Sequence, residues 1–213
     1  IYEEDHMKRL LPCLLSLALI SGCASGESPA TAPVTEHPAD EVVVVMGPTS
    51  EPEAGFDPAF GWGAGAHVHE PLIQSTLTVT NADLTIGYDL ATDMAVSDDG
   101  LTWTVTIRDD VSFTDGASLT AEDVAFTYNT VKATSSVNDF TMLSSAEAID
   151  DTTVVFHMTK PYSIWPYTMA TVGIVPEHAY DSATYGSNPI GSGRYTLVQW
   201  NRGEQIIPVS YTH

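Results

Sequence analysis

The chain has 213 residues, enough to bury a core in one large domain or two small ones, and its 43% hydrophobic content is typical of globular proteins. Its 28 acidic and 7 basic residues give a formal net charge of −21, which argues against nucleic acid as a partner because binding phosphates takes Lys and Arg. The same charge disfavours a basic membrane-binding patch and fits either a solubilising surface or one that attracts cationic solutes.

The N-terminal residues predict an export signal. Residues 1–6 look like sequence upstream of a true start at Met7, which opens a basic n-region. Residues 10–20 are apolar but too few to span a bilayer as a helix, which is typical of a signal peptide. We therefore predict a signal peptide over residues 7–22.

The end of this signal resembles a bacterial lipobox. Ser21 and Gly22 are small enough to let a peptidase reach the bond before Cys23, whose thiol would carry diacylglycerol. We predict lipidation of Cys23, with the protein outside the cytoplasm, anchored to the outer face of the cell membrane or in the periplasm. The alternative is an ordinary signal peptide with an incidental cysteine. Cys13, the other cysteine, lies within the apolar run, so the folded part has no cysteine for a disulfide or a metal site.

Three segments of different composition follow. Residues 23–40 are rich in Pro, Ser, Thr, Ala and Glu without a hydrophobic period, which predicts a disordered tether. Residues 41–46 contain four consecutive valines, typical of a strand buried on both faces. Gly and Pro dominate residues 47–65, which predicts an irregular loop. Three alternating glycines in this loop do not form a dinucleotide-binding motif, because they stand too far from the strand and no helix cap follows.

A strand, a turn and a helix are predicted next. Residues 101–108 alternate apolar and polar side chains, the pattern of a half-buried strand, and Asp115 and Gly116 supply a turn. Thr120 is a good helix N-cap, although Asp123 stands where a capping box prefers Glu. The apolar stripe of this helix consists of Ala121, Val124, Ala125, Tyr128 and Val131.

The other expected elements are short. By residue range they are a strand at 76–80, a hairpin turn at 98–100, a second hairpin over 146–158, a helix within 161–171 and a strand at 172–175. Gly191 and Gly193 then permit positive φ and close backbone approach. Residues 208–213 break the alternation of the preceding segment, and we interpret them as a tail of doubtful origin.

No catalytic motif is present in the sequence. The nucleophile-elbow pattern is absent, because Gly191-Ser192-Gly193 has the wrong spacing, and there is no His-Glu-x-x-His, P-loop or Cys/His cluster. Pairs of adjacent aspartates occupy turn and strand-break positions, where Asp caps local backbone: Asp98-Asp99, Asp109-Asp110 and Asp150-Asp151. The sequence therefore predicts that the protein is not an enzyme.

Four stretches carry a resemblance to a known family. In chain order they are His69-Glu70-Pro71-Leu72, Ser97 to Trp103, Arg108 to Val124 and Pro189 to Tyr195. Their order and spacing resemble the extracellular solute-binding proteins of peptide and nickel ABC importers, family 5, over about residues 42–207. Two positions depart from the family: Tyr88 and Arg194 each stand where Pro is usual.

The resemblance implies an α/β fold like that of type II periplasmic binding proteins. Residues 41–207 would form the N-terminal part of the solute-binding lobe, with a subdomain inserted at about 70–179 and the second lobe absent. The implied function is capture of an oligopeptide or related small solute and delivery to the permease subunits, by a monomer without a cofactor. The alternative is a peptide-sensing or pheromone receptor of the same fold. With one lobe alone, we expect weak ligand binding or none.

The resemblance also implies candidate site residues. In the family, the loop that leaves the first strand lies beside the ligand cleft, so Glu51, Phe60 and Trp62 are candidate ligand-binding residues. Arg194 is a further candidate for an anionic ligand group, although a surface or inter-strand ion pair would also explain it. A helix is expected over residues 64–75, and two histidines two positions apart would point to different sides of it. We therefore predict no metal site at His67 and His69.

Overall fold

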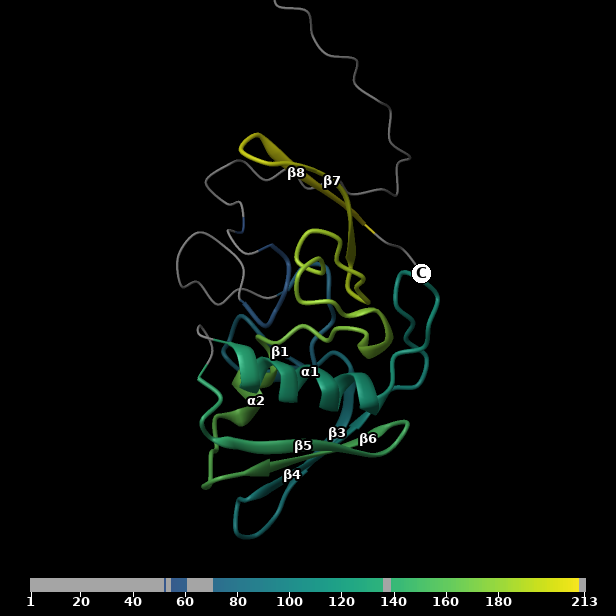
Figure 1. Cartoon of the computed structure of the whole chain (residues 1–213). Coiled ribbons are helices and arrows are strands. Elements are labelled where there is room, and N and C mark those ends of the chain that lie inside the picture. Colours follow the sequence, from purple (N-terminus) through teal and green to yellow (C-terminus); the bar gives the residue numbers. More distant parts are fainter. Residues whose placement is uncertain (1–51, 53–54, 61–70, 136–138, 211–213) are drawn as a thin grey trace, which may run out of the picture. The chain divides into compact units, whose positions relative to one another are not determined.

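The computed structural model describes residues 52, 55–60, 71–135 and 139–210 (Figure 1). All of these residues belong to one compact unit of the chain. The predicted signal peptide, the lipidation site, the tether and the valine-rich strand lie outside the described residues.

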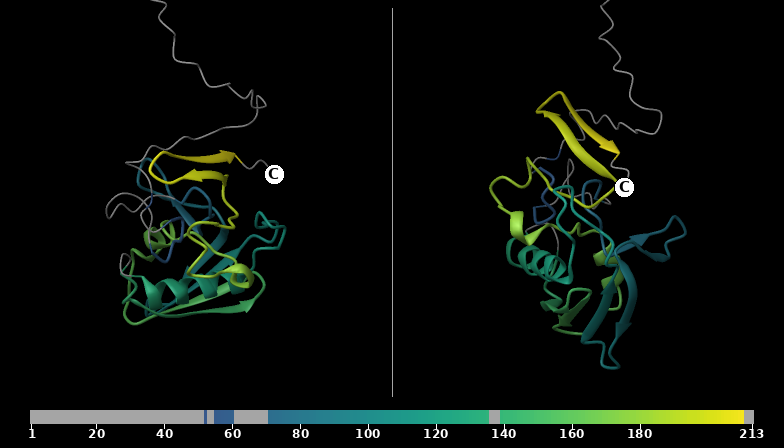
Figure 2. Two further views of the ribbon diagram at one scale, coloured as in Figure 1. Left: turned by 45° about the horizontal axis from the view of Figure 1, so that its top comes forward. Right: turned by 90° about the vertical axis from the view of Figure 1, so that its right-hand side faces the viewer.

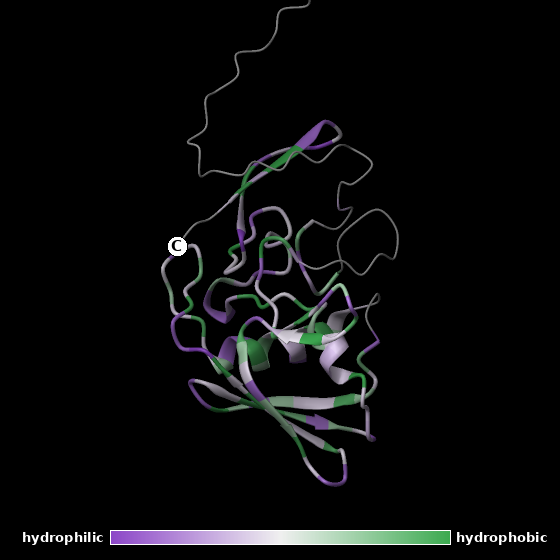
Figure 3. Ribbon diagram, turned by 180° about the vertical axis from the view of Figure 1, so that it is seen from behind, coloured by the Kyte–Doolittle hydropathy of each residue, from purple (hydrophilic) through white to green (hydrophobic). Residues whose placement is uncertain are grey.

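The largest element of the fold is an antiparallel sheet with the strand order β3-β4-β6-β5. Its strands are β3 (Ala91–Val96), β4 (Thr102–Ile107), β6 (Thr153–Met158) and β5 (Leu143–Asp150). Strand β4 alternates as predicted, with Trp103, Val105 and Ile107 buried, and β6 buries every second residue in the same way. Figure 3 shows hydrophobic and hydrophilic positions alternating along these strands.

Tight turns connect the strands as predicted. The turn between β3 and β4 uses Gly100 at a φ of +70°, and the Asp99 carboxylate accepts the Leu101 backbone N–H at 3.0 Å. In the turn between β5 and β6, the Asp150 carboxylate accepts the Thr152 backbone N–H at 2.9 Å. The paired aspartates at these turns therefore cap local backbone, as the sequence indicates.

Helix α1 (Ala121–Thr134) lies on one face of this sheet, as the views in Figures 1 and 2 agree. All five residues of the predicted stripe are buried. The capping box forms although Asp replaces the preferred Glu, because the Asp123 side chain reaches the Thr120 backbone N–H and accepts it at 2.9 Å. Its second oxygen accepts the Glu177 backbone N–H at 2.9 Å, which ties the 3₁₀ turn η2 (Glu177–Ala179) to the start of α1.

Aromatic rings fill the space between helix and sheet. Tyr128 packs at 4.8 Å from Phe156 and 5.6 Å from Trp165, measured between ring centroids, and Phe140 completes the cluster. Trp165 begins the short helix α2 (Trp165–Met169), where Pro166 sits in the first turn as predicted. Burial of each such ring contributes about 2–3 kcal/mol, so this cluster is the main apolar anchor of α1 and α2.

Two further hairpins complete the described fold. They are formed by β1 (Thr78–Thr80) with β2 (Ile86–Tyr88), and by β7 (Tyr195–Asn201) with β8 (Gln205–Ser210). The second hairpin corrects the predicted break at residue 208, because Pro208 continues β8 opposite Leu197 and is buried like Ile206. A bulge between Leu197 and Gln199 lies next to this pair, at the point where the proline cannot donate to the ladder. The interpretation of residues 208–213 as a tail of doubtful origin stays a prediction.

Two predicted elements differ in the structure. Residues 71–75 are not helical. The Leu72 carbonyl accepts the Tyr195 backbone N–H and the Ile73 carbonyl accepts the Gly193 backbone N–H, so this segment lies along residues 193–195, the returning chain. Residues 172–175 are buried but form no strand: Ile174 donates to the Ser75 carbonyl and Val175 to the Thr127 hydroxyl. An apolar run predicts burial more reliably than it predicts a ladder partner.

Candidate functional site

Arg194, one of the ligand-binding candidates predicted from the sequence, lines a cavity of about 330 Å³. Phe60 is 37% exposed and is not among the residues that line this cavity. Glu51 and Trp62 lie outside the described residues, so the structure does not place them. A role of these four residues in ligand binding stays a prediction.

The cavity lies where the sheet meets the returning chain. Its walls come from the start of the β1 hairpin, the segment after β2, the end of β4 and the segment before β7. The lining residues are Gln74, Ser75, Val79, Asp89, Leu90, Arg108, Asp110, Val111, Ser192, Gly193 and Arg194. Residues far apart in the sequence therefore form one cavity, whose lining is polar and apolar in similar measure.

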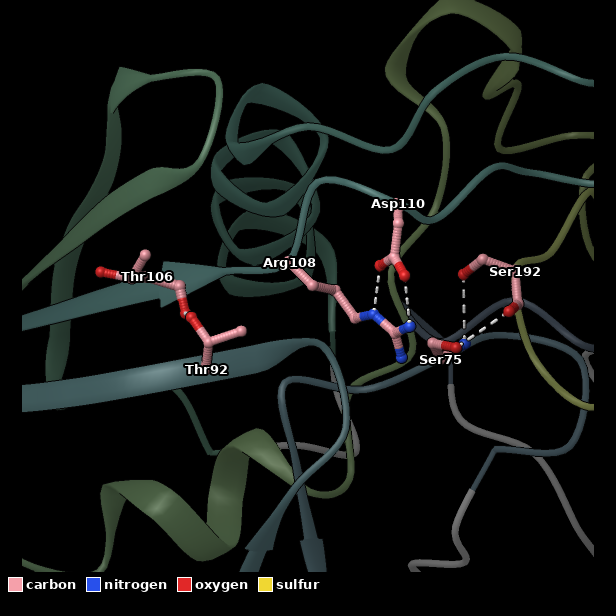
Figure 4. Close-up of polar contacts among 6 residues, drawn as sticks. All are labelled: Ser75, Thr92, Thr106, Arg108, Asp110 and Ser192. Carbon is pink, nitrogen blue, oxygen red and sulfur yellow. Dashed lines mark hydrogen bonds and ion pairs between the residues drawn. The ribbon is translucent and has the colours of Figure 1, made fainter.

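Arg108 and Asp110 form the charged pair of this cavity (Figure 4). The Arg108 Nε and Nη2 atoms donate to the two Asp110 oxygens at 2.5 and 2.8 Å, a bidentate arrangement. This hydrogen bond raises the pKa of Arg108 and lowers the pKa of Asp110. Because the side chains are 45% and 64% exposed, water screens the pair, and it contributes little to the stability of the fold.

The strand ends beside this pair are held in place by backbone contacts. Arg108 donates its backbone N–H to the Leu90 carbonyl at 2.9 Å. Next to it, β3 has a bulge between Ala91 and Asp93, and the Thr92 hydroxyl donates to the Thr106 carbonyl at 3.2 Å (Figure 4). The pairing of β3 with β4 resumes beyond the bulge with Ala91 opposite Ile107, which brings Leu90 and Arg108 together at the cavity wall.

The opposite wall is formed by Ser75 and Ser192 (Figure 4). The Ser75 hydroxyl donates to the Ser192 carbonyl at 2.9 Å, and the Ser192 hydroxyl accepts the Ser75 backbone N–H at 3.4 Å. The flanking glycines allow this approach, because a Cβ on Gly191 would overlap the Ile73 carbonyl oxygen and one on Gly193 would lie 2.8 Å from it. The predicted close approach of both glycines is confirmed, and neither needs a positive φ.

A buried polar network lies behind this wall. Gln74 donates to the Phe56 carbonyl at 2.8 Å and to the Tyr185 hydroxyl at 3.3 Å, while Tyr180 donates to the Asp57 carboxylate at 2.9 Å. Asp57 is 1% exposed, and this burial raises its pKa, although hydrogen bonds from Ala59 and Tyr180 act in the opposite direction. Burial also raises the pKa values of both tyrosines, so they stay neutral donors.

Groups for metal binding or catalysis are not gathered in the described part of the chain. No cluster of three or more His, Cys, Asp or Glu side chains that could hold a metal ion is found there. His178 and Asp115 form a pair at 2.8 Å, but no serine or threonine hydroxyl is hydrogen-bonded to this histidine within the described ranges. No described helix is both long and apolar enough to cross a membrane.

Sequence reasoning missed most of the cavity. The sequence places Arg108 on the polar face of a predicted strand and Asp110 where that strand is interrupted. No local pattern predicts that either lies beside Ser192 or Arg194. An arginine at the end of a strand, followed two positions later by an aspartate, could have indicated the ion pair, but the opposite wall comes from contacts distant in sequence.

The comparisons with known proteins identify the family. Residues 85–213, more than half of the chain, match the middle part of family 5 of the bacterial extracellular solute-binding proteins. The chain belongs to this family, whose members are substrate-binding proteins of ABC transporters and not enzymes. The resemblance seen in the sequence and the expectation of a non-enzyme are thereby confirmed.

Individual relatives agree with this assignment. Protein XP55 of Streptomyces lividans is 35% identical over 174 residues, which cover 76% of this chain and 31% of that protein. NikZ from Campylobacter jejuni, solved with Ni(L-His), is 29% identical with a TM-score of 0.65, and the match covers 73% of this chain and 33% of NikZ. AppA from Bacillus subtilis, solved with a nonapeptide, is 28% identical with a TM-score of 0.64, and the match covers 75% of this chain and 34% of AppA.

These matches confirm the fold class. The described residues have the α/β fold of part of the first lobe of a type II periplasmic binding protein. The chain spans less than half the length of the curated relatives that it matches, with shares of 31%, 42% and 39% for the first three.

Proposed function

We propose that the chain is the first lobe of a substrate-binding lipoprotein of an ABC importer. In this proposal it captures an oligopeptide or a related small solute outside the cytoplasm and delivers it to the permease subunits by closing against a second lobe. The protein acts as a monomer, and Cys23 carries the lipid that holds it at the outer face of the membrane.

Membership of the family over residues 85–213 is the observation that carries this proposal. Relatives whose names state a peptide or peptide-like ligand support the substrate class: AppA is an oligopeptide-binding protein and GsiB a glutathione-binding protein. The acidic composition also supports it, because a chain of net charge −21 repels nucleic acid and does not hinder binding of neutral or cationic peptides.

Ligand uptake by cells tests the proposal. Deleting the gene should abolish uptake of the peptides that bind to the purified full-length protein, and restoring the gene should return it. The peptides are identified by mass spectrometry of protein purified with its native ligand. Unchanged uptake, together with a lost transcriptional response to the same peptides, would favour the peptide-sensing receptor instead.

A further inference from the structure

Two cationic side chains converge on one cavity in a chain that has few of them. The chain contains 7 basic residues against 28 acidic ones, yet Arg108 and Arg194 both line the same hollow of about 330 Å³. This volume lies at the small end of the usual range for ligand pockets, which suits a molecule the size of a modified amino acid or a dipeptide.

The two arginines differ in what already binds them. Arg108 holds both oxygens of Asp110, so its charge is matched (Figure 4). Asp89, the other carboxylate of the cavity, accepts the Thr76 backbone N–H at 2.9 Å. Among the described residues no carboxylate lies within ion-pair distance of Arg194, whose side chain is exposed. Arg194 is therefore the charge in this cavity that is left for an incoming anion.

Apolar side chains accompany this charge. Val79, Leu90 and Val111 line the same cavity. We propose that the cavity binds a small solute with a carboxylate and a short apolar body, the carboxylate pairing with Arg194 and the body packing against Val79 and Val111, which are partly exposed. This inference rests on the proposed function, because it assigns a ligand chemistry to one wall of the solute-binding lobe.

The structure also indicates how strong this binding is. A single exposed guanidinium with solvent access gives a weak and salt-dependent interaction. We therefore expect a dissociation constant in the millimolar range, which weakens further as salt is added.

Titration of the full chain with N-acetylvaline and N-acetylvalinamide, followed by two-dimensional NMR, tests the inference. The two probes differ only in the carboxylate, and neither has an ammonium group that could pair with Asp89. We expect the acid to shift resonances of Leu90, Val111 and Ser192, and the amide to bind about tenfold more weakly or not at all, since loss of one charge-assisted pair corresponds to about tenfold in affinity.

Matched variants separate Arg194 from general charge. Arg194→Gln should weaken binding of the acid about tenfold. Arg202→Gln removes the same charge outside the cavity, where Arg202 lies 4.2 Å over the Trp200 ring, and should leave binding unchanged. Arg194→Lys keeps the charge without the bidentate geometry and should bind the acid with intermediate affinity. Its affinity tests the role of residue 194 even if the glutamine variant does not fold.

Three results would overturn the inference: no binding of the acid, equal binding of acid and amide, or equal loss in the Arg194 and Arg202 variants. Each of these leaves the importer proposal standing if uptake still depends on the gene. Conversely, uptake that survives deletion refutes the importer while the cavity can still bind the acid, so the two failures are distinguishable.

Discussion

Single side chains in this protein contribute through where they are buried rather than through reactive chemistry. Asp57 has one carboxylate oxygen on the Ala59 backbone N–H at 2.8 Å and the other on the Tyr180 hydroxyl, and it is almost fully inaccessible to water. It joins residues 55–60 to the segment that leads into Tyr185, whose hydroxyl donates to the Ile190 carbonyl at 2.6 Å. A buried acid in such a position makes stability depend on pH.

The effect of Asp57 has a definite sign. Its pKa is raised in the folded state above the unfolded value of about 3.9, so its contribution to the free energy of unfolding is full below that value and falls as pH rises through the folded pKa. Asp57→Asn removes the ionisation while keeping an oxygen for Ala59. We expect the variant to gain stability relative to the parent as pH increases from about 4 to 7, measured by urea unfolding at several pH values.

Asp83→Asn is the matched control for this measurement. Asp83 is exposed and accepts hydrogen bonds from the Thr85 hydroxyl and backbone, which lower its pKa. The ionised Asp83 therefore stabilises the folded state above its unfolded pKa, and this stabilisation is lost as pH falls through the folded pKa. We expect Asp83→Asn to be less stable than the parent at neutral pH and to approach the parent's stability in acid. A stability difference for Asp57→Asn that is constant across pH would contradict the assignment.

At the scale of elements, helix α1 also protects an edge of the sheet. Strand β5 is one of the two outer strands in the order β3-β4-β6-β5, and an open edge invites pairing with another chain. The Asn129 side chain donates to the Ala146 carbonyl at 2.8 Å and accepts the Ala146 backbone N–H at 3.0 Å. Lys132 donates to the Ser144 carbonyl at 2.8 Å. Two side chains of α1 therefore occupy backbone groups that a foreign strand would need.

Asn129→Ala tests this protection. The variant loses both hydrogen bonds to Ala146 and leaves partly buried backbone groups without partners, so we expect a loss of about 1–3 kcal/mol in the free energy of unfolding. We also expect concentration-dependent association, seen by light scattering, because the edge becomes available. The neighbouring Thr130→Ala should change both by much less, and equal effects of the two substitutions would refute the edge role.

Several of these elements could be predicted from the sequence, and others could not, for physical reasons. Strand β4 and helix α1 have strong periods of two and 3.6, and both form as expected. Residues 172–175 carry an apolar run with no period, so burial was foreseeable but the missing ladder was not. In the cavity, Arg194 could be suggested from its departure from the family pattern. Arg108 joins it only through contacts far apart in the chain, which no local pattern contains.

At the scale of the whole molecule, the N-terminal segment would determine where the lobe works. The proposed lipid anchor depends on Cys23 alone, because one thiol receives the diacylglycerol. Cys23→Ser should abolish incorporation of labelled fatty acid and leave the protein uncleaved at this signal, whereas Cys13→Ser, within the signal itself, should preserve both. Fatty-acid labelling that survives in the Cys23 variant would refute lipidation at this residue.

The hydrogen bond from Ser75 to the Ser192 carbonyl joins positions 117 apart in sequence. The intervening chain holds the four-stranded sheet and α1, and its two ends therefore lie side by side. Gly191 and Gly193 allow the backbones of these two ends to approach closely. A loop whose two stems touch can be lengthened, trimmed or exchanged for another without pulling either stem apart. An exchange of the enclosed subdomain would therefore have to preserve the contact between Ser75 and the segment from Gly191 to Gly193.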